Sequence, residues 1–140
     1  MKKILILVCM IVLAFAFVSC SKDGGGNSGM LTVQINFYVP DPEYPTTIPV
    51  GEGATFSVTV TQNGKEVDPS AVTISTFKDS SIGQLRIWND GGTINFQGDK
   101  ITKQYSEVTD CKVGAVSGSE KFGLIATYKG YTAKITLSTN

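Results

Sequence analysis

Apolar and polar residues alternate with a period of two over several stretches of this chain. The pattern is clearest in residues 31–39, where every second residue from Leu31 to Val39 is apolar. Successive side chains of a strand point to opposite faces of a sheet, so this alternation predicts strands with one buried face. Alternation is weak in residues 99–118, and the register of that segment stays open. The predicted strands are 31–39, 54–61, 72–77, 85–88, 93–96, 112–116, 122–128 and 133–137.

Turn-forming residues separate these strands. Asn63-Gly64 and Lys129-Gly130 are typical of tight turns that need positive φ, and residues 89–92 (NDGG) predict a hairpin between 85–88 and 93–96. Four prolines between residues 40 and 49 predict a loop or an edge segment, because each proline lacks a backbone donor. Seven or eight short strands in residues 31–140 predict an all-β fold, an antiparallel β-sandwich.

Two stretches carry a family resemblance. Residues 49–58 (PVGEGATFSV) and 122–133 (FGLIATYKGYTA) resemble the second strand and the closing hairpin of bacterial immunoglobulin-like domains. The resemblance implies an immunoglobulin-like sandwich over residues 31–140, matched at both ends and not in its centre. The paired cysteines and the strand-C tryptophan of antibody domains are absent from the sequence, which excludes the antibody subtype.

The amino terminus has the pattern of a secretion signal. Lys2 and Lys3 precede 15 apolar residues, 4–18, fewer than the ~20 that span a hydrocarbon core. Val18-Ser19-Cys20 follows and resembles the lipobox of bacterial lipoproteins. The resemblance implies that residues 1–19 are a cleaved signal peptide and that Cys20 receives a diacylglycerol and usually an amide-linked acyl chain. The alternatives are an uncleaved anchor and a buried cysteine.

A lipidated Cys20 would fix the protein to a membrane without a transmembrane helix, because two acyl chains hold much more firmly than one. Residues 20–30 are then the lipidated cysteine and a flexible linker rich in glycine and polar residues. Lys22-Asp23 resembles the acid-containing segment by which some Gram-negative lipoproteins are exported to the surface. The expected location is the cell envelope, as an outer-membrane lipoprotein, with surface exposure and a periplasmic orientation both open.

The amino-acid composition excludes several classes of function. The chain has no histidine, which removes the commonest proton-transfer group and neutral metal ligand. Without residues 1–19, ten basic residues face twelve acidic ones, a net charge of −2 that offers no basic surface for nucleic acid. Cys111 lacks the histidine partner that usually activates a catalytic thiol, and we expect it to be a packed thiol. We therefore expect no enzyme, no cofactor and no nucleic-acid partner.

Aromatic residues supply the candidate ligand contacts. Trp88 precedes Asn89 and Asp90 in a predicted turn, where an indole beside polar groups could stack on a sugar. Tyr131 is a second candidate contact, and Tyr38, Tyr44 and Tyr128 could extend such a surface. The favoured alternative is that Trp88 closes the sandwich core and that the tyrosines lie half-buried on strands.

Four acids near turns are candidate calcium ligands: Asp79, Asp90, Asp99 and Asp110. They lie about ten residues apart without the D-x-D-x-D spacing of a calcium loop, so we expect solvated turn acids and no metal.

Two functions remain open. The first is a lipid-anchored, non-catalytic binding or adhesion module for a glycan, a host protein or an envelope protein. The second is a structural accessory subunit of a larger envelope complex, joined for example by strand addition at a sheet edge. The fold itself names no ligand.

Overall fold

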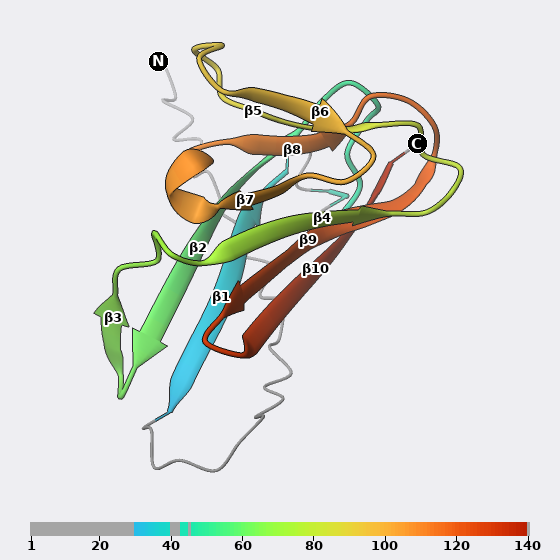
Figure 1. Cartoon of the computed structure of the whole chain (residues 1–140). Helices are drawn as coiled ribbons and strands as arrows, with labels where there is room; N and C mark the ends of the chain where they lie inside the picture. The colour runs from blue at the N-terminus through green and yellow to red at the C-terminus, as the bar shows by residue number, and fades with distance from the viewer. Residues whose placement is uncertain (1–29, 40–42, 45, 140) are drawn as a thin grey trace, which may run out of the picture.

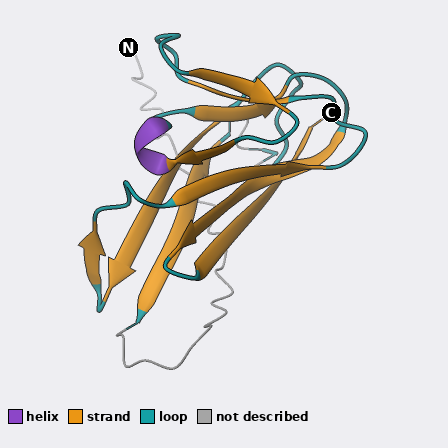
Figure 2. Cartoon of the chain, viewed as in Figure 1, coloured by secondary structure: helices purple, strands orange, loops and turns teal. Residues whose placement is uncertain are grey.

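The computed structural model describes residues 30–39, 43–44 and 46–139. The predictions made for residues 1–29, including the lipidation of Cys20, lie outside the described residues. Within the described ranges, no helix is long and apolar enough to cross a bilayer. The only helical element there is η1, one short 3-10 turn at Tyr105–Glu107 (Figure 2). The strands are β1 Leu31–Tyr38, β2 Ala54–Gln62, β3 Lys65–Val67, β4 Thr73–Lys78, β5 Leu85–Trp88, β6 Asn95–Gly98, β7 Thr102–Gln104, β8 Lys112–Ala115, β9 Glu120–Tyr128 and β10 Tyr131–Thr139.

The strands form two antiparallel sheets that pack face to face (Figure 1). Sheet 1 has the order β1-β2-β8-β5-β6, and β3 pairs with β2 beside this path. Sheet 2 has the order β10-β9-β4-β7. The predicted all-β antiparallel sandwich is therefore confirmed.

Seven of the strands follow the order of the immunoglobulin sandwich, in which strands A, B, E and D form one sheet and C, F and G the other. In chain order, β1, β2, β4, β5, β8, β9 and β10 take the places of A to G. The predicted total of seven or eight strands is wrong, because the described residues hold ten strands and an isolated bridge at Thr47. The two strands that were not predicted, β3 and β7, have three residues each, too few for a period of two to identify.

The β2–β3 and β9–β10 hairpins have the predicted turns. In the β2–β3 turn Asn63 and Gly64 have φ of 54° and 77°, and in the β9–β10 turn Lys129 and Gly130 have φ of 48° and 81°. Positive φ at both central residues gives a turn whose twist matches that of the flanking strands. The β5–β6 hairpin is also confirmed, although its second strand begins two residues later than predicted, at Asn95.

The proline-rich segment after β1 reaches the edge of sheet 2. Thr47 bridges Ser138 of β10 in parallel, the Ile48 amide donates to the Ser138 carbonyl at 2.8 Å, and the Ser138 amide donates to the Thr46 carbonyl at 2.8 Å. The described part of this segment is thus a loop with one edge contact, as predicted.

The core lies between the inner faces of the two sheets and follows the predicted alternation. In β1 and β2 every second residue is buried, and in β9 and β10 the buried positions include Phe122, Leu124, Ile135 and Leu137. Because each inner face is filled by apolar residues, the outer faces are left to polar side chains and a few aromatic rings. The largest fully buried side chains are Phe56, Phe122, Ile35, Ile48, Ile74, Ile82, Leu85, Ile87, Leu124, Leu137, Val33 and Val60.

Candidate functional site

Trp88 lies on the outer face of sheet 1 and not in the core. Leu85 and Ile87 of β5 are fully buried, so their neighbours Arg86 and Trp88 point away from the sandwich. The interpretation that Trp88 closes the core is therefore wrong. The spacing of Leu85 and Ile87 in the sequence was the signal that places Trp88 outside, since a strand cannot direct adjacent residues to the same face.

Two glycines, Gly53 and Gly114, lie under the indole. A Cβ atom on Gly53 would lie 2.5 Å from Cη2 of Trp88, and one on Gly114 would lie 3.1 Å from the same atom. A Cβ contact of 2.5 Å is essentially never seen and one of 3.1 Å is unusually tight, so the ring can lie across the backbone at Gly53 and Gly114 because neither position carries a side chain. The indole is half-buried in this way while the core contributes nothing to its burial.

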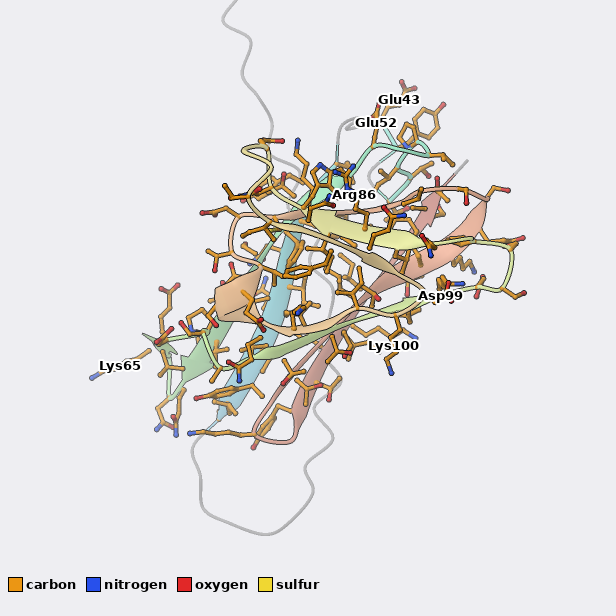
Figure 3. The ribbon with its side chains drawn as sticks, turned by 45° about the horizontal axis from the view of Figure 1, so that its top comes forward. Glu43, Glu52, Lys65, Arg86, Asp99 and Lys100 are labelled. Carbon is orange, nitrogen blue, oxygen red and sulfur yellow. The ribbon has the colours of Figure 1, made fainter. Side chains whose placement is uncertain are left out.

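Charged and amide groups surround the ring. The Arg86 guanidinium lies over the indole at 4.8 Å from the ring centroid, and its Nε donates to Oδ1 of Asn95 at 2.7 Å. Lys112, directly opposite Trp88 on β8, pairs with the exposed Asp90 carboxylate, with Nζ 2.6 Å from Oδ1. Cation–π contacts and charge-assisted hydrogen bonds of this kind hold side chains in place. Figure 3 shows Arg86 projecting from β5 among the outer side chains.

A row of side chains crosses sheet 1 through this cluster. The strand register joins neighbouring positions on β1, β2, β8, β5 and β6, all on the outer face. We call this row, together with Arg86 and Asp90, the Trp88 surface. The positions in register are Tyr38, Thr55, Lys112, Trp88 and Asn95.

The tip of the β5–β6 hairpin is fixed by one side chain. Asn89 Oδ1 accepts from the Ile94 amide at 3.0 Å, and Asn89 Nδ2 donates to Oγ1 of Thr93 at 2.7 Å. The backbone adds a hydrogen bond from the Asn89 amide to the Ile94 carbonyl at 3.1 Å. These three hydrogen bonds join the two ends of the loop that carries Asp90 beside Trp88.

The structure does not bring the second candidate contact, Tyr131, to Trp88. Tyr131 begins β10 in sheet 2, opposite Tyr128, and both rings pack against the rim of the core. The β9–β10 turn lies at the lower end of the molecule in Figure 1, whereas the tip of β5–β6 lies at its top. Of the other tyrosines, Tyr38 belongs to the Trp88 surface and is 45% exposed, and Tyr44 is 57% exposed in the loop after β1.

Cys111 is a buried free thiol, as expected of a packed cysteine. Burial, with a smaller contribution from the Asp110 carboxylate, raises the pKa of the Cys111 thiol to about 11. The thiol is therefore protonated at neutral pH and is a poor nucleophile.

The four turn acids are dispersed. Asp90 pairs with Lys112, Asp99 lies 3.7 Å from Nζ of Lys78, and Asp79 Oδ2 accepts from the Lys121 amide at 3.4 Å. Over the described ranges, no group of three or more acidic or cysteine side chains converges on a point that could hold a metal ion.

No protein-family model, curated protein or solved structure matches this chain. Any functional conclusion must therefore come from the side chains themselves. Of the two predicted contacts, Trp88 is the one that the structure places on an outer sheet face among charged and amide groups.

Proposed function

We propose that this chain is a lipid-anchored cell-envelope protein whose sandwich acts as a non-catalytic binding or adhesion module for a glycan or a protein. The observation that carries the proposal is the Trp88 surface. A tryptophan on an outer sheet face, held on two glycines and bordered by an arginine, a lysine, an aspartate and an asparagine, has no role in the core.

The chemistry of the Trp88 surface suits a sugar. The apolar C–H face of a pyranose can pack on the exposed part of the indole, while its hydroxyl groups donate to Asp90 and accept from Lys112. Trp and Arg are also the side chains that contribute most to protein–protein interfaces, so a protein ligand would use the same residues. In both cases the ligand contacts the face of sheet 1.

The test is a glycan array probed with the purified full-length protein in detergent. We expect binding that Trp88→Ala weakens at least about tenfold while the circular dichroism spectrum is unchanged. Because Trp88 is the only tryptophan, titration of a bound glycan should also change the intrinsic fluorescence.

Lys65→Gln is the control, since Lys65 is an exposed charge at the start of β3 and does not belong to the Trp88 surface. Its binding to the same glycan should equal that of the wild type. A folded Trp88→Ala variant that retains every ligand of the wild type would contradict the proposal.

The proposed anchor has a separate test. Mass spectrometry of the mature amino terminus should find Cys20 as the first residue, carrying diacylglycerol and an amide-linked acyl chain. An unmodified Cys20, or an intact Met1, would refute the lipid anchor and leave the proposal about Trp88 standing.

The edge of β10 favours the second candidate function, a structural accessory subunit. The amide and carbonyl of Ser138 both point to the Thr46–Ile48 segment. Because the direction of backbone groups alternates along a strand, the amides and carbonyls of Thr132, Lys134 and Thr136 point to the same edge. No hydrogen bond joins these three residues' edge-facing backbone groups to another described residue. An extended segment of a partner could add a strand there.

Strand addition predicts one stoichiometric envelope protein that co-purifies with the full-length chain after cross-linking. Thr136→Pro removes an edge donor that does not pair with β9 and should abolish this association. Lys129→Gln is the control, because it keeps every backbone donor and should leave the association intact. Thr127→Pro is unsuitable, because it would break pairing within sheet 2. Recovery of the chain without a partner would refute this alternative.

A further inference from the structure

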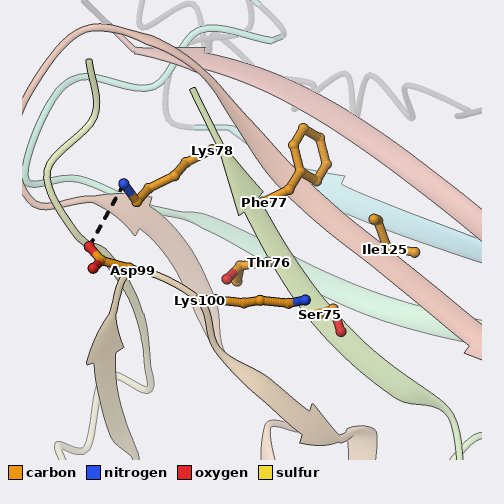
Figure 4. A pocket seen from close by; sticks show the side chains of 7 residues that line it. All are labelled: Ser75, Thr76, Phe77, Lys78, Asp99, Lys100 and Ile125. Atoms are coloured by element: carbon orange, nitrogen blue, oxygen red, sulfur yellow. Dashed lines mark ion pairs between the residues drawn. The ribbon is translucent and has the colours of Figure 1, made fainter. Parts of the chain in front are cut away.

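A pocket lies along β4 of sheet 2, whereas the Trp88 surface lies on sheet 1. The pocket has a volume of about 480 Å³, within the range of about 300–1,000 Å³ found for small-molecule sites. We call it the β4 pocket, because four consecutive residues of β4 contribute to it (Figure 4). Its lining residues are Ser75, Thr76, Phe77, Lys78, Asp99, Lys100 and Ile125.

The apolar wall of the pocket consists of Phe77 and Ile125. Both are half-buried on the outer face, and neither packs against the core. A Cβ on Gly123 would lie 2.7 Å from Cζ of Phe77, so this ring, like Trp88, lies over a glycine of the neighbouring strand. Lys134 Nζ lies 4.4 Å from the Phe77 ring centroid and fixes it from β10. Phe77 and Ile125 therefore form a preformed apolar wall, with the Lys134 ammonium over the Phe77 ring.

The opposite wall is polar and partly fixed. Lys78 Nζ donates to the Ile82 carbonyl at 2.8 Å and lies 3.7 Å from Asp99 Oδ1, and the Lys78 side chain is only 18% exposed. The Asp99 side chain is 80% exposed, so its carboxylate can still accept hydrogen bonds from a ligand. Figure 4 shows this ion pair on the side of the pocket away from Phe77 and Ile125.

Lys100 supplies the available positive charge. It is exposed and has no ion-pair partner among the described residues. Figure 4 shows its side chain extending across the pocket toward Ser75, whose hydroxyl lies 3.4 Å from that of Thr102. Since Lys78 and Asp99 offset each other, the lining has a net charge of +1.

We propose that the β4 pocket binds an acidic sugar residue, a hexuronate, with its carboxylate on Lys100 and its apolar C–H groups against Phe77 and Ile125. The sugar hydroxyl groups then donate to Asp99 and exchange hydrogen bonds with Ser75. Three features of the lining favour this class: the Lys100 ammonium attracts an anion, the Asp99 carboxylate can accept from a hydroxyl group, and the apolar wall can pack against C–H groups. A simple anion satisfies only the first, and a neutral sugar leaves Lys100 without a counter-charge.

The test is isothermal titration calorimetry of the full-length protein in detergent with oligomers of galacturonate and of glucuronate. Neutral galactose and glucose oligomers of the same length are the comparison ligands. We expect a uronate oligomer to bind at least about tenfold more tightly than its neutral counterpart, and to bind more weakly at high ionic strength. Free hexuronate should compete, which would distinguish recognition of one residue from recognition of an extended chain.

Three variants locate the site. Lys100→Gln and Phe77→Ala should each weaken uronate binding about tenfold or more. Lys65→Gln, which removes an exposed charge at the tip of the β2–β3 hairpin far from Lys100, should change nothing (Figure 3). Lys100 is exposed and makes no contact that the fold requires, so a folded Lys100→Gln variant is expected by circular dichroism.

Trp88→Ala separates this proposal from the proposed function, since it should leave uronate binding unchanged. Uronate binding should likewise not change the fluorescence of Trp88. Equal affinity of Lys100→Gln and the wild type, equal affinity for uronate and neutral oligomers, or no uronate binding at millimolar concentration would each overturn the proposal.

Discussion

At the scale of single residues, glycines decide where the outward aromatic rings lie. Gly114 lies under Trp88, and a Cβ there would meet both the indole and the backbone carbonyl of Glu52. The carbonyl belongs to the neighbouring chain segment and cannot rotate away as a side chain could. An added methyl group at Gly114 must therefore displace backbone as well as Trp88.

Gly114→Ala should lower the free energy of unfolding by about 1–3 kcal/mol, the usual cost of overpacking. Chemical denaturation measures this, and the emission of the single Trp88 should shift to longer wavelength as the ring moves into water. Gly91→Ala is the control, because Gly91 lies at the hairpin tip with no atom within 4 Å of its added Cβ. It should change stability by less than about 0.5 kcal/mol. An unchanged emission spectrum in a folded Gly114→Ala variant would contradict the position of the indole over Gly114.

At the scale of elements, the β5–β6 hairpin depends on Asn89. Asn89→Ala loses the hydrogen bonds to the Ile94 amide and to Thr93, and should lower the free energy of unfolding by about 1–2 kcal/mol. Asn89→Asp keeps the acceptor for the Ile94 amide and should lower the free energy of unfolding by less. Chemical denaturation measures the change in the free energy of global unfolding, and amide hydrogen exchange at Ile94 measures the change in local opening of the hairpin. Equal losses in the two variants would show that the acceptor is not the important group.

The sequence predicts those elements whose two faces differ in polarity. β1, β2 and β10 alternate cleanly, β9 does so apart from the buried Gly123, and the Asn-Gly and Lys-Gly turns follow from local backbone chemistry. β7 could not be predicted, because Thr102–Gln104 contains no apolar residue and becomes a strand through pairing with β4. The contact of Thr47 with Ser138 likewise joins residues 91 positions apart. Such pairings depend on the assembled sheets and leave no local pattern.

The candidate sites were predictable only in part, for the same reason. Trp88 is identifiable from its neighbours, since Leu85 and Ile87 take the inner face. The alternation of Ile74 and Thr76 also places Phe77 outside, yet nothing local indicates that Asp99 and Lys100, more than twenty residues later, complete a pocket around it. The sequence could not show whether Tyr131 lies beside Trp88, because this depends on which sheet, and which end of the sandwich, each strand occupies.

At the scale of the whole molecule, the described sandwich is held by its two inner faces, since its one cysteine, Cys111, is a free thiol. The contribution of that core can be separated from that of the outer faces by the same substitution on adjacent strands of sheet 2. Phe122 of β9 is fully buried between the sheets, whereas Phe77 of β4 lies outside over Gly123. The two positions are almost opposite in the sheet, since Phe77 pairs with Gly123 and Lys78 with Phe122.

Phe122→Ala should lower the free energy of unfolding by about 3–5 kcal/mol, the cost of a buried cavity, and Phe77→Ala by only about 1 kcal/mol. A domain of this size is stable by about 5–15 kcal/mol, so Phe122→Ala should unfold at much lower denaturant concentration while Phe77→Ala stays folded. Denaturation followed by far-ultraviolet circular dichroism measures both. This difference is what makes Phe77→Ala usable in the binding experiments. If its loss approached that of Phe122→Ala, Phe77 would be a structural residue and the apolar wall of the β4 pocket would have to be tested with Ile125→Ser instead.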